Sequence, residues 1–130
     1  MKKQSGFTVI ELLVFFVILV TLGVVFFVQK NNLEVSARDD KRKTAINAMY
    51  YDLTEVFHKQ NNYYPAEISS ENLKAIDPEL FTDPFGVQLG DEGGNYHYEA
   101  IDCDNDGKCQ QFKLSADMEK EAEFKRSSEG

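Results

Sequence analysis

The chain has 130 residues, a length that predicts one domain with one small core. Its 14 Lys and Arg stand against 22 Asp and Glu, and the net charge of −8 excludes a protein that holds nucleic acid by bulk electrostatic attraction. The apolar fraction is 42% but the mean hydropathy is −0.41, so the apolar residues must be clustered and the remainder strongly hydrophilic.

The apolar cluster is residues 7–28, in which Glu11 is the only charged residue. As a helix this run would be about 33 Å long, enough to cross a hydrocarbon core of about 30 Å. Lys2 and Lys3 precede it, and the positive-inside tendency predicts a cytoplasmic N-terminus and an exported, acidic C-terminal part. The sequence therefore predicts a single-pass membrane protein.

Two ordinary explanations of this N-terminus compete. A secretory signal peptide cleaved behind Ala37 would need an apolar region of about 7 to 15 residues, which is shorter than the run observed. A plain signal anchor explains the length but not Glu11, because a carboxylate within a membrane helix costs about 2.5 to 3.5 kcal/mol on insertion. Such a carboxylate normally marks a function.

The residues around Glu11 form a specific pattern. From Lys2 to Leu13 the sequence is KKQSGFTVIELL, a basic leader, a Gly-Phe step and a Glu at the fifth position after the glycine. This pattern resembles the leader of type IV pilins and of the pseudopilins of type II secretion. The resemblance implies that residues 1–6 are removed by a membrane prepilin peptidase, which cuts between Gly6 and Phe7, and that Phe7 is N-methylated.

The resemblance also implies a role for Glu11 in assembly. Cleavage would expose an α-amino group on Phe7, and a buried carboxylate is tolerable when a cation compensates it. In the family this glutamate meets the amine of a neighbouring subunit, whereas the four-residue spacing also allows a pair within one helix. Both alternatives stay open. The family's other partners are an assembly-platform membrane protein and a cytoplasmic assembly ATPase.

The helix is expected to continue through residues 29–62, without Pro or Gly, as an amphipathic second half. One face carries apolar residues at three- and four-residue spacing: Ile46, Met49, Tyr50, Leu53, Val56 and Phe57. Before this stripe lies a basic cluster, Arg38, Lys41, Arg42 and Lys43. We expect a solvated helix face; the alternative is contact with acidic surfaces of adjacent subunits or with lipid headgroups.

Residues 63–130 are expected to form a small globular head. The sequence predicts a short capped helix at residues 69–76 and a turn at residues 83–86, Asp-Pro-Phe-Gly. That turn resembles the Asp-Pro-Trp-Gly step of major pseudopilins and many small pilins, with Phe85 as the aromatic plug. The predicted fold class is α+β, a long helix packed on a small antiparallel sheet, as in pilins.

A hairpin is the best-defined feature of the head. Strands at residues 96–103 and 109–116 flank a five-residue connection rich in turn formers. Cys103 and Cys109 would then face each other, and export favours a disulfide over the alternative of two reduced thiols. The apolar alternation of Phe112, Leu114, Ala116 and Met118 would place these side chains against the helix.

The acidic residues of the hairpin raise the question of a metal. Asp102, Asp104 and Asp106 followed by Gly107 match the opening of an EF-hand loop, which would make a calcium site, but Lys113 stands where a bidentate glutamate is needed. The alternative is a solvated acidic turn, and no other cofactor is expected. His58 and His97 have no nucleophile motif beside them, so no enzyme is predicted.

These patterns favour a pilin, the structural subunit of a type IV pilus-like filament that is a homo-oligomer. We expect it in the cell membrane before assembly, with the head exported, and in an extracellular filament afterwards. One alternative is the major pseudopilin of a type II secretion system. The other is a membrane-tethered calcium or ligand-binding module that does not polymerise. Adhesion, twitching motility, DNA uptake and secretion all stay open as roles of the filament.

Overall fold

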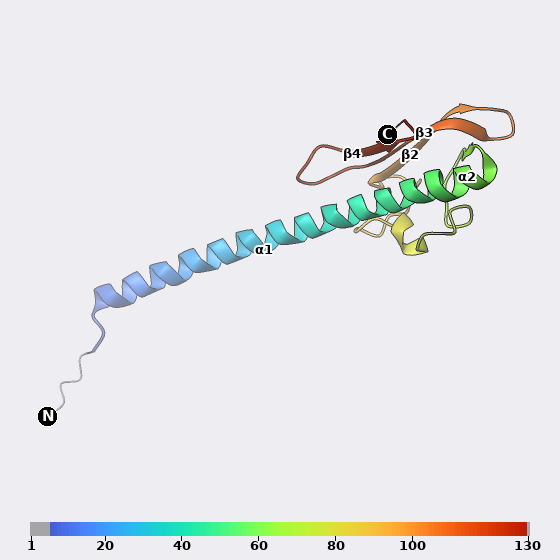
Figure 1. Ribbon diagram of the computed structural model, residues 1–130. Helices are drawn as coiled ribbons and strands as arrows, with labels where there is room; N and C mark the ends of the chain where they lie inside the picture. The colour runs from blue at the N-terminus through green and yellow to red at the C-terminus, as the bar shows by residue number, and fades with distance from the viewer. Residues whose placement is uncertain (1–5, 130) are drawn as a thin grey trace. The chain divides into compact units, whose positions relative to one another are not determined.

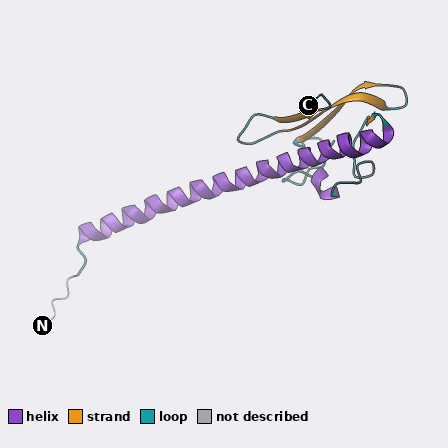
Figure 2. Ribbon diagram, viewed as in Figure 1, coloured by secondary structure: helices purple, strands orange, loops and turns teal. Residues whose placement is uncertain are grey.

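The computed structural model describes residues 6–129, and Figures 1 and 2 show its helices and strands. Lys2 and Lys3 of the predicted leader lie outside the described residues. The chain separates into two compact units, with the division after Val35. The first unit holds the apolar part of the helix, and the second, from Ser36, holds the rest of the helix and the sheet.

The predicted long helix is confirmed. Helix α1 runs from Val9 to Tyr51 and continues as a π-helical segment, η1 (Asp52–Phe57), and a short helix, α2 (His58–Asn61). It ends at Asn62, whose left-handed backbone (φ 62°) lets its amide donate to the His58 carbonyl oxygen at 2.7 Å. The π-helical segment was not predicted from the sequence.

The predicted hairpin is confirmed as the centre of a four-stranded antiparallel sheet. Strand β2 (Tyr96–Cys103) pairs with β3 (Lys108–Ala116). On its other side β3 pairs with β1 (Tyr64–Pro65) near one end and with β4 (Phe124–Ser127) near the other. The sequence did not predict β1 or β4, because two and four residues are too few to show strand alternation.

The core is formed by the second half of the helix, by β3, and by Ile68, Leu73 and Phe81 of the segment between β1 and β2. The predicted alternation holds up to the end of β3, because Phe112, Leu114 and Ala116 are fully buried. Met118 lies beyond the strand and is only partly buried. The Phe112 ring packs against Tyr64 with ring centroids 4.7 Å apart.

Of the predicted stripe, Ile46, Met49 and Leu53 are fully buried, and Tyr50 and Phe57 pack partly buried against the core. Ala45 is a further buried apolar residue of the helix. Burial of each large apolar side chain contributes about 1.5 to 3 kcal/mol.

The predicted short helix at residues 69–76 is wrong. The carbonyl oxygen of Ser69 accepts the amide of Leu73 at 3.0 Å, which closes a single turn. The amide of Ala75, which a longer helix would need, instead donates to the carboxylate of Asp52 on η1 at 3.0 Å. A 3-10 helix, η2 (Pro78–Phe81), follows instead, because Asp77 caps its start and Pro78 suits a first helical position.

The predicted turn at residues 83–86 is confirmed. The amide of Gly86 donates to the carbonyl oxygen of Asp83 at 3.0 Å, and Gly86 has φ 86°, which favours glycine. The buried carboxylate of Asp83 accepts the amides of Phe85 and Val87 at 2.9 Å and the side-chain amide of Asn95 at 2.7 Å. Burial alone would raise the pKa of Asp83, but these hydrogen bonds outweigh it and lower the pKa.

The predicted aromatic plug is wrong. The Phe85 side chain is 61% exposed, because the carboxylate of Asp83 rather than the ring occupies the space beneath the turn. The ring lies against two guanidinium groups of α1, those of Arg38 and Arg42, each 5.4 Å from its centroid. Phe85 therefore forms a surface contact with the helix and adds little to the core.

The basic cluster of α1 is not the solvated face that the sequence predicted. Arg42 is 1% exposed and donates to the buried carboxylate of Asp39 at 2.6 Å. Asp39 also accepts the backbone amides of Glu119 and Lys120, each at 3.0 Å. Burial by itself would raise the pKa of Asp39, but the two amides and the Arg42 guanidinium more than compensate and lower it.

Residues 117–123, which join β3 to β4 and are called here the C-terminal strap, supply the acidic partners of this cluster. The Arg38 guanidinium binds the Glu119 carboxylate at 2.7 Å, and the Arg42 guanidinium reaches the same carboxylate at 3.4 Å. Lys43 binds Glu121 at 2.8 Å. Three of the four cations thus meet acids of their own chain.

Candidate functional site: the apolar helix and its N-terminal carboxylate

The predicted cleavage site lies just before the helix. Gly6, Phe7 and Thr8 precede the first helical residue, Val9, and are exposed. A Cβ atom added at Gly6 would meet no atom within 4 Å, and the backbone of Gly6 is not in the left-handed region. Among the described residues, neither packing nor backbone geometry therefore requires glycine at this position.

Glu11 lies in the first turn of α1, where a negative charge interacts favourably with the helix dipole. Its backbone amide donates to the hydroxyl of Thr8 at 3.3 Å, which caps the helix start. Within residues 6–129 no Lys, Arg or His side chain forms an ion pair with the Glu11 carboxylate. The carboxylate is thus available to a cation supplied from elsewhere.

The helix that carries Glu11 presents a continuous apolar surface. Every large apolar side chain from Phe7 to Val28 is at least 50% exposed, and none belongs to the core. The helical stretch Val9–Asn61 contains a window long and apolar enough to cross a membrane. An exposed apolar surface of this size requires lipid or protein to cover it.

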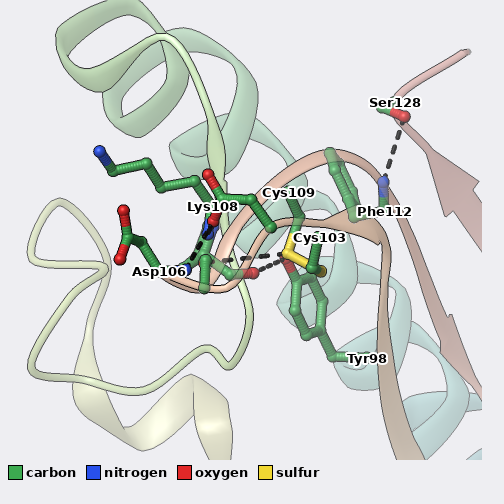
Figure 3. The surroundings of a disulfide bond; sticks show 10 residues. Tyr98, Cys103, Asp106, Lys108, Cys109, Phe112 and Ser128 are labelled. Atoms are coloured by element: carbon green, nitrogen blue, oxygen red, sulfur yellow. Dashed lines mark hydrogen bonds between the residues drawn. A yellow bond between two sulfur atoms is a disulfide. The ribbon is translucent and has the colours of Figure 1, made fainter.

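The predicted disulfide between Cys103 and Cys109 is confirmed, and Figure 3 shows it at the end of the β2–β3 hairpin. The two residues are register partners whose Cα atoms are 3.9 Å apart. Nearby, the Tyr98 hydroxyl donates to the carbonyl oxygen of Pro65 at 2.7 Å, and burial raises the pKa of Tyr98. These contacts join the hairpin to β1.

The three aspartates of the predicted calcium site do not converge. Asp104 turns its carboxylate inward on the loop, where one oxygen accepts the amides of Asp106 and Lys108 at 2.9 Å. Asp102 belongs to β2, before the loop, and its backbone is in the left-handed region with φ 55°. Across residues 6–129 no group of three or more His, Cys, Asp or Glu side chains is arranged to hold a metal ion. The carboxylate of Asp104 shapes the turn instead.

The two histidines take part in surface contacts. The His58 ring stacks on Tyr64 with centroids 4.6 Å apart, and His97 Nε2 lies 2.9 Å from a carboxylate oxygen of Asp117. The His97–Asp117 pair is more than half exposed. Both rings therefore contact side chains of their own chain, and His97 also lines a surface pocket of about 500 Å³.

Comparison with known proteins identifies the N-terminal segment. Residues 1–27 match the family model described as the prokaryotic N-terminal methylation motif. Searches of curated proteins and of solved structures give no significant match. The motif and the fold, a long apolar helix followed by a small antiparallel sheet, indicate a structural subunit. The chain therefore carries the leader signature of type IV pilins and pseudopilins.

Proposed function

We propose that this protein is a pilin, the structural subunit of a type IV pilus-like filament that is assembled from the membrane. One observation carries the proposal: the methylation motif leads directly into a helix whose large apolar side chains are all exposed up to Val28. A membrane covers that surface before assembly, and neighbouring copies cover it in the filament.

Processing prepares the chain for assembly. Prepilin peptidase cuts the Gly6–Phe7 bond, which removes the leader and frees the α-amino group of Phe7. Methylation leaves this amine basic, so it stays cationic near neutral pH. The new charge lies four residues before Glu11, whose carboxylate lacks a cation among the described residues.

The Phe7 amine and Glu11 supply register between subunits. In a low-dielectric filament core an unpaired carboxylate costs several kcal/mol, so a subunit is stable where its Glu11 meets an amine. Apolar packing supplies the contact area. Because lipid is as apolar as the helix, helices that associate within the membrane are stabilised by van der Waals packing and not by the hydrophobic effect. Once the helices have left the membrane, the hydrophobic effect stabilises their contacts and keeps each subunit in the filament. The assembly platform and its ATPase provide the work of extraction.

A second candidate is the major pseudopilin of a type II secretion system. The turn at residues 83–86 is compatible with it, because the step that this turn resembles occurs in major pseudopilins as well as in many small pilins. Extended surface filaments in electron micrographs would support the pilin, and loss of exported enzymes on deletion of the gene would support the pseudopilin. If neither surface filaments nor a loss of exported enzymes is observed, the protein is a membrane-tethered module that does not polymerise.

The mass of the natural N-terminus tests the proposal. We expect mature protein that begins at N-methylated Phe7. Gly6→Ala should remain uncleaved yet folded, whereas Gly23→Ala, at another glycine with open space around it, should be processed normally. Protein that retains Met1, or begins after Ala37, would contradict the proposal.

A further inference from the structure

A groove of about 650 Å³ lies within the second compact unit, between residues 40–45 of α1 and the segment that contains η2. Its apolar lining comes from Ala45, Leu80, Pro84 and Tyr96. Its charged lining consists of four carboxylates, Asp40, Asp77, Glu79 and Asp83, and one cation, Lys41. The groove is thus apolar within and negative overall.

Three of these carboxylates are available to a ligand. Asp83 is buried and its oxygens accept hydrogen bonds from Phe85, Val87 and Asn95. Asp40, Asp77 and Glu79 are exposed, although one oxygen of Asp77 already accepts the backbone amide of Glu79 at 3.0 Å. Among residues 6–129 none of the three forms an ion pair. An apolar wall with a carboxylate rim suits a lysine side chain, which buries its methylene stem and keeps its ammonium in contact with acids.

The chain carries such a lysine on its opposite face. Figures 1 and 2 show the sheet on one side of the second half of the helix and η2 on the other. Because Phe112 and Leu114 point toward the helix, Lys113 between them points away from it and is exposed. Within the described part of the chain Lys113 makes no ion pair, although Glu99 is its register partner on β2.

We propose that the groove receives Lys113 of a second copy of this chain in the assembled filament. A symmetric contact of groove with groove would bring like charges together, which is unfavourable. A contact between two different surfaces on opposite faces is heterologous, and its repetition produces an open helical filament. The inference rests on the proposed function and specifies which head surfaces meet.

Charge reversal tests the contact in cells that express the full chain. Lys113→Glu and Glu79→Lys should each lower filament yield at least about tenfold, equivalent to a loss of about 1.4 kcal/mol per contact. The double variant Lys113→Glu with Glu79→Lys should restore the yield, because it re-creates the pair with exchanged charges. Lys74→Glu, at another exposed lysine without an ion pair among the described residues, should leave the yield unchanged.

Crosslinking of the unaltered protein gives an independent readout. A zero-length carbodiimide should produce covalent dimers in which mass spectrometry finds Lys113 joined to Glu79, Asp40 or Asp77. Normal filaments from Lys113→Glu together with no such crosslink would overturn the inference and leave the proposed function intact. A crosslink from the groove to a different protein would overturn the second copy as occupant. Monomeric wild-type protein without filaments would overturn the proposed function as well.

Discussion

Asp39, in the middle of α1, accepts the backbone amide of Glu119, which lies 80 residues later in the sequence, at 3.0 Å. The same carboxylate binds Arg42 at 2.6 Å and is buried beneath the C-terminal strap. One buried side chain of the helix therefore holds the main chain of the loop between the last two strands, next to the ion pairs of this loop with the helix.

Asp39→Ala should destabilise the head by about 3 kcal/mol, because it leaves the guanidinium of Arg42 and two backbone amides without their acceptor. Urea denaturation of detergent-solubilised protein, followed by near-UV circular dichroism, measures the change. Asp40→Ala is the matched control, since Asp40 is exposed and should change stability by less than about 0.5 kcal/mol. Equal stability of the two variants would contradict the role assigned to Asp39.

The pKa of Asp39 is lowered in the folded protein, so its contribution to stability is present above its unfolded pKa of about 3.8 and is lost as the pH falls through the folded value.

Asp52 behaves in the opposite way, because burial raises its pKa despite the amide of Ala75. Ionisation of Asp52 therefore destabilises the fold as the pH rises above 3.8. Asp52→Asn should gain stability over the wild type with rising pH, as measured by Tm from pH 3 to pH 7; a Tm difference that does not change with pH would argue against this assignment.

Phe85→Ala should cost about 1 kcal/mol, since the ring is exposed and contributes chiefly its contacts with two guanidinium groups. Phe112→Ala should cost about 3 to 5 kcal/mol, because the Phe112 side chain is fully buried. Thermal unfolding of both variants compares them directly. A loss at Phe85 as large as that at Phe112 would mean that Phe85 is a core plug after all.

Replacing both cysteines, as Cys103→Ser with Cys109→Ser, should lower the free energy of unfolding by about 2 kcal/mol, the value for a short closed loop in the chain-entropy model. Denaturation of wild-type protein with and without reductant provides the comparison. The double variant should not respond to reductant. A wild type that also ignores the reductant would contradict a disulfide in the natural protein.

Glu11→Ala should leave membrane insertion and leader cleavage intact and abolish filaments, because the subunit loses the partner of the Phe7 amine. Membrane fractionation, N-terminal mass and electron microscopy provide the three readouts. Glu34→Ala is the control, since Glu34 already pairs with Lys30 within the helix. Abundant normal filaments from Glu11→Ala would remove the assembly role of this carboxylate.

The long helix, the hairpin and the disulfide could be predicted because each depends on a local signal. Apolar residues recur at helical spacing from Ile46 to Phe57, and the strands up to Cys103 and from Cys109 alternate around a loop of turn formers. Such signals involve residues close together in sequence. The methylation motif is equally local, since it is confined to residues 1–27.

The predictions that failed concern contacts between distant segments. Arg42 looked like a solvated helix residue because its neighbour Asp39 is visible in the sequence, whereas the strap that buries both is about 80 residues away. Similarly, the helix expected at residues 69–76 did not form where Asp52 captures the amide of Ala75. In both cases a buried carboxylate with a tertiary partner overrides local propensity, and periodicity carries no information about such a partner.

Asp39 accepts hydrogen bonds from main-chain amides of the strap, so these bonds do not depend on the side chains at positions 119 and 120. Proline is the exception, because it has no amide hydrogen. Side-chain changes at these two positions should therefore leave the amide hydrogen bonds in place, although a change at Glu119 also removes the acidic partner of Arg38 and Arg42. Inserting or deleting one residue, in contrast, would displace both amide donors from the carboxylate. The length of this loop, more than its composition, is the quantity that evolution or an engineer must keep constant.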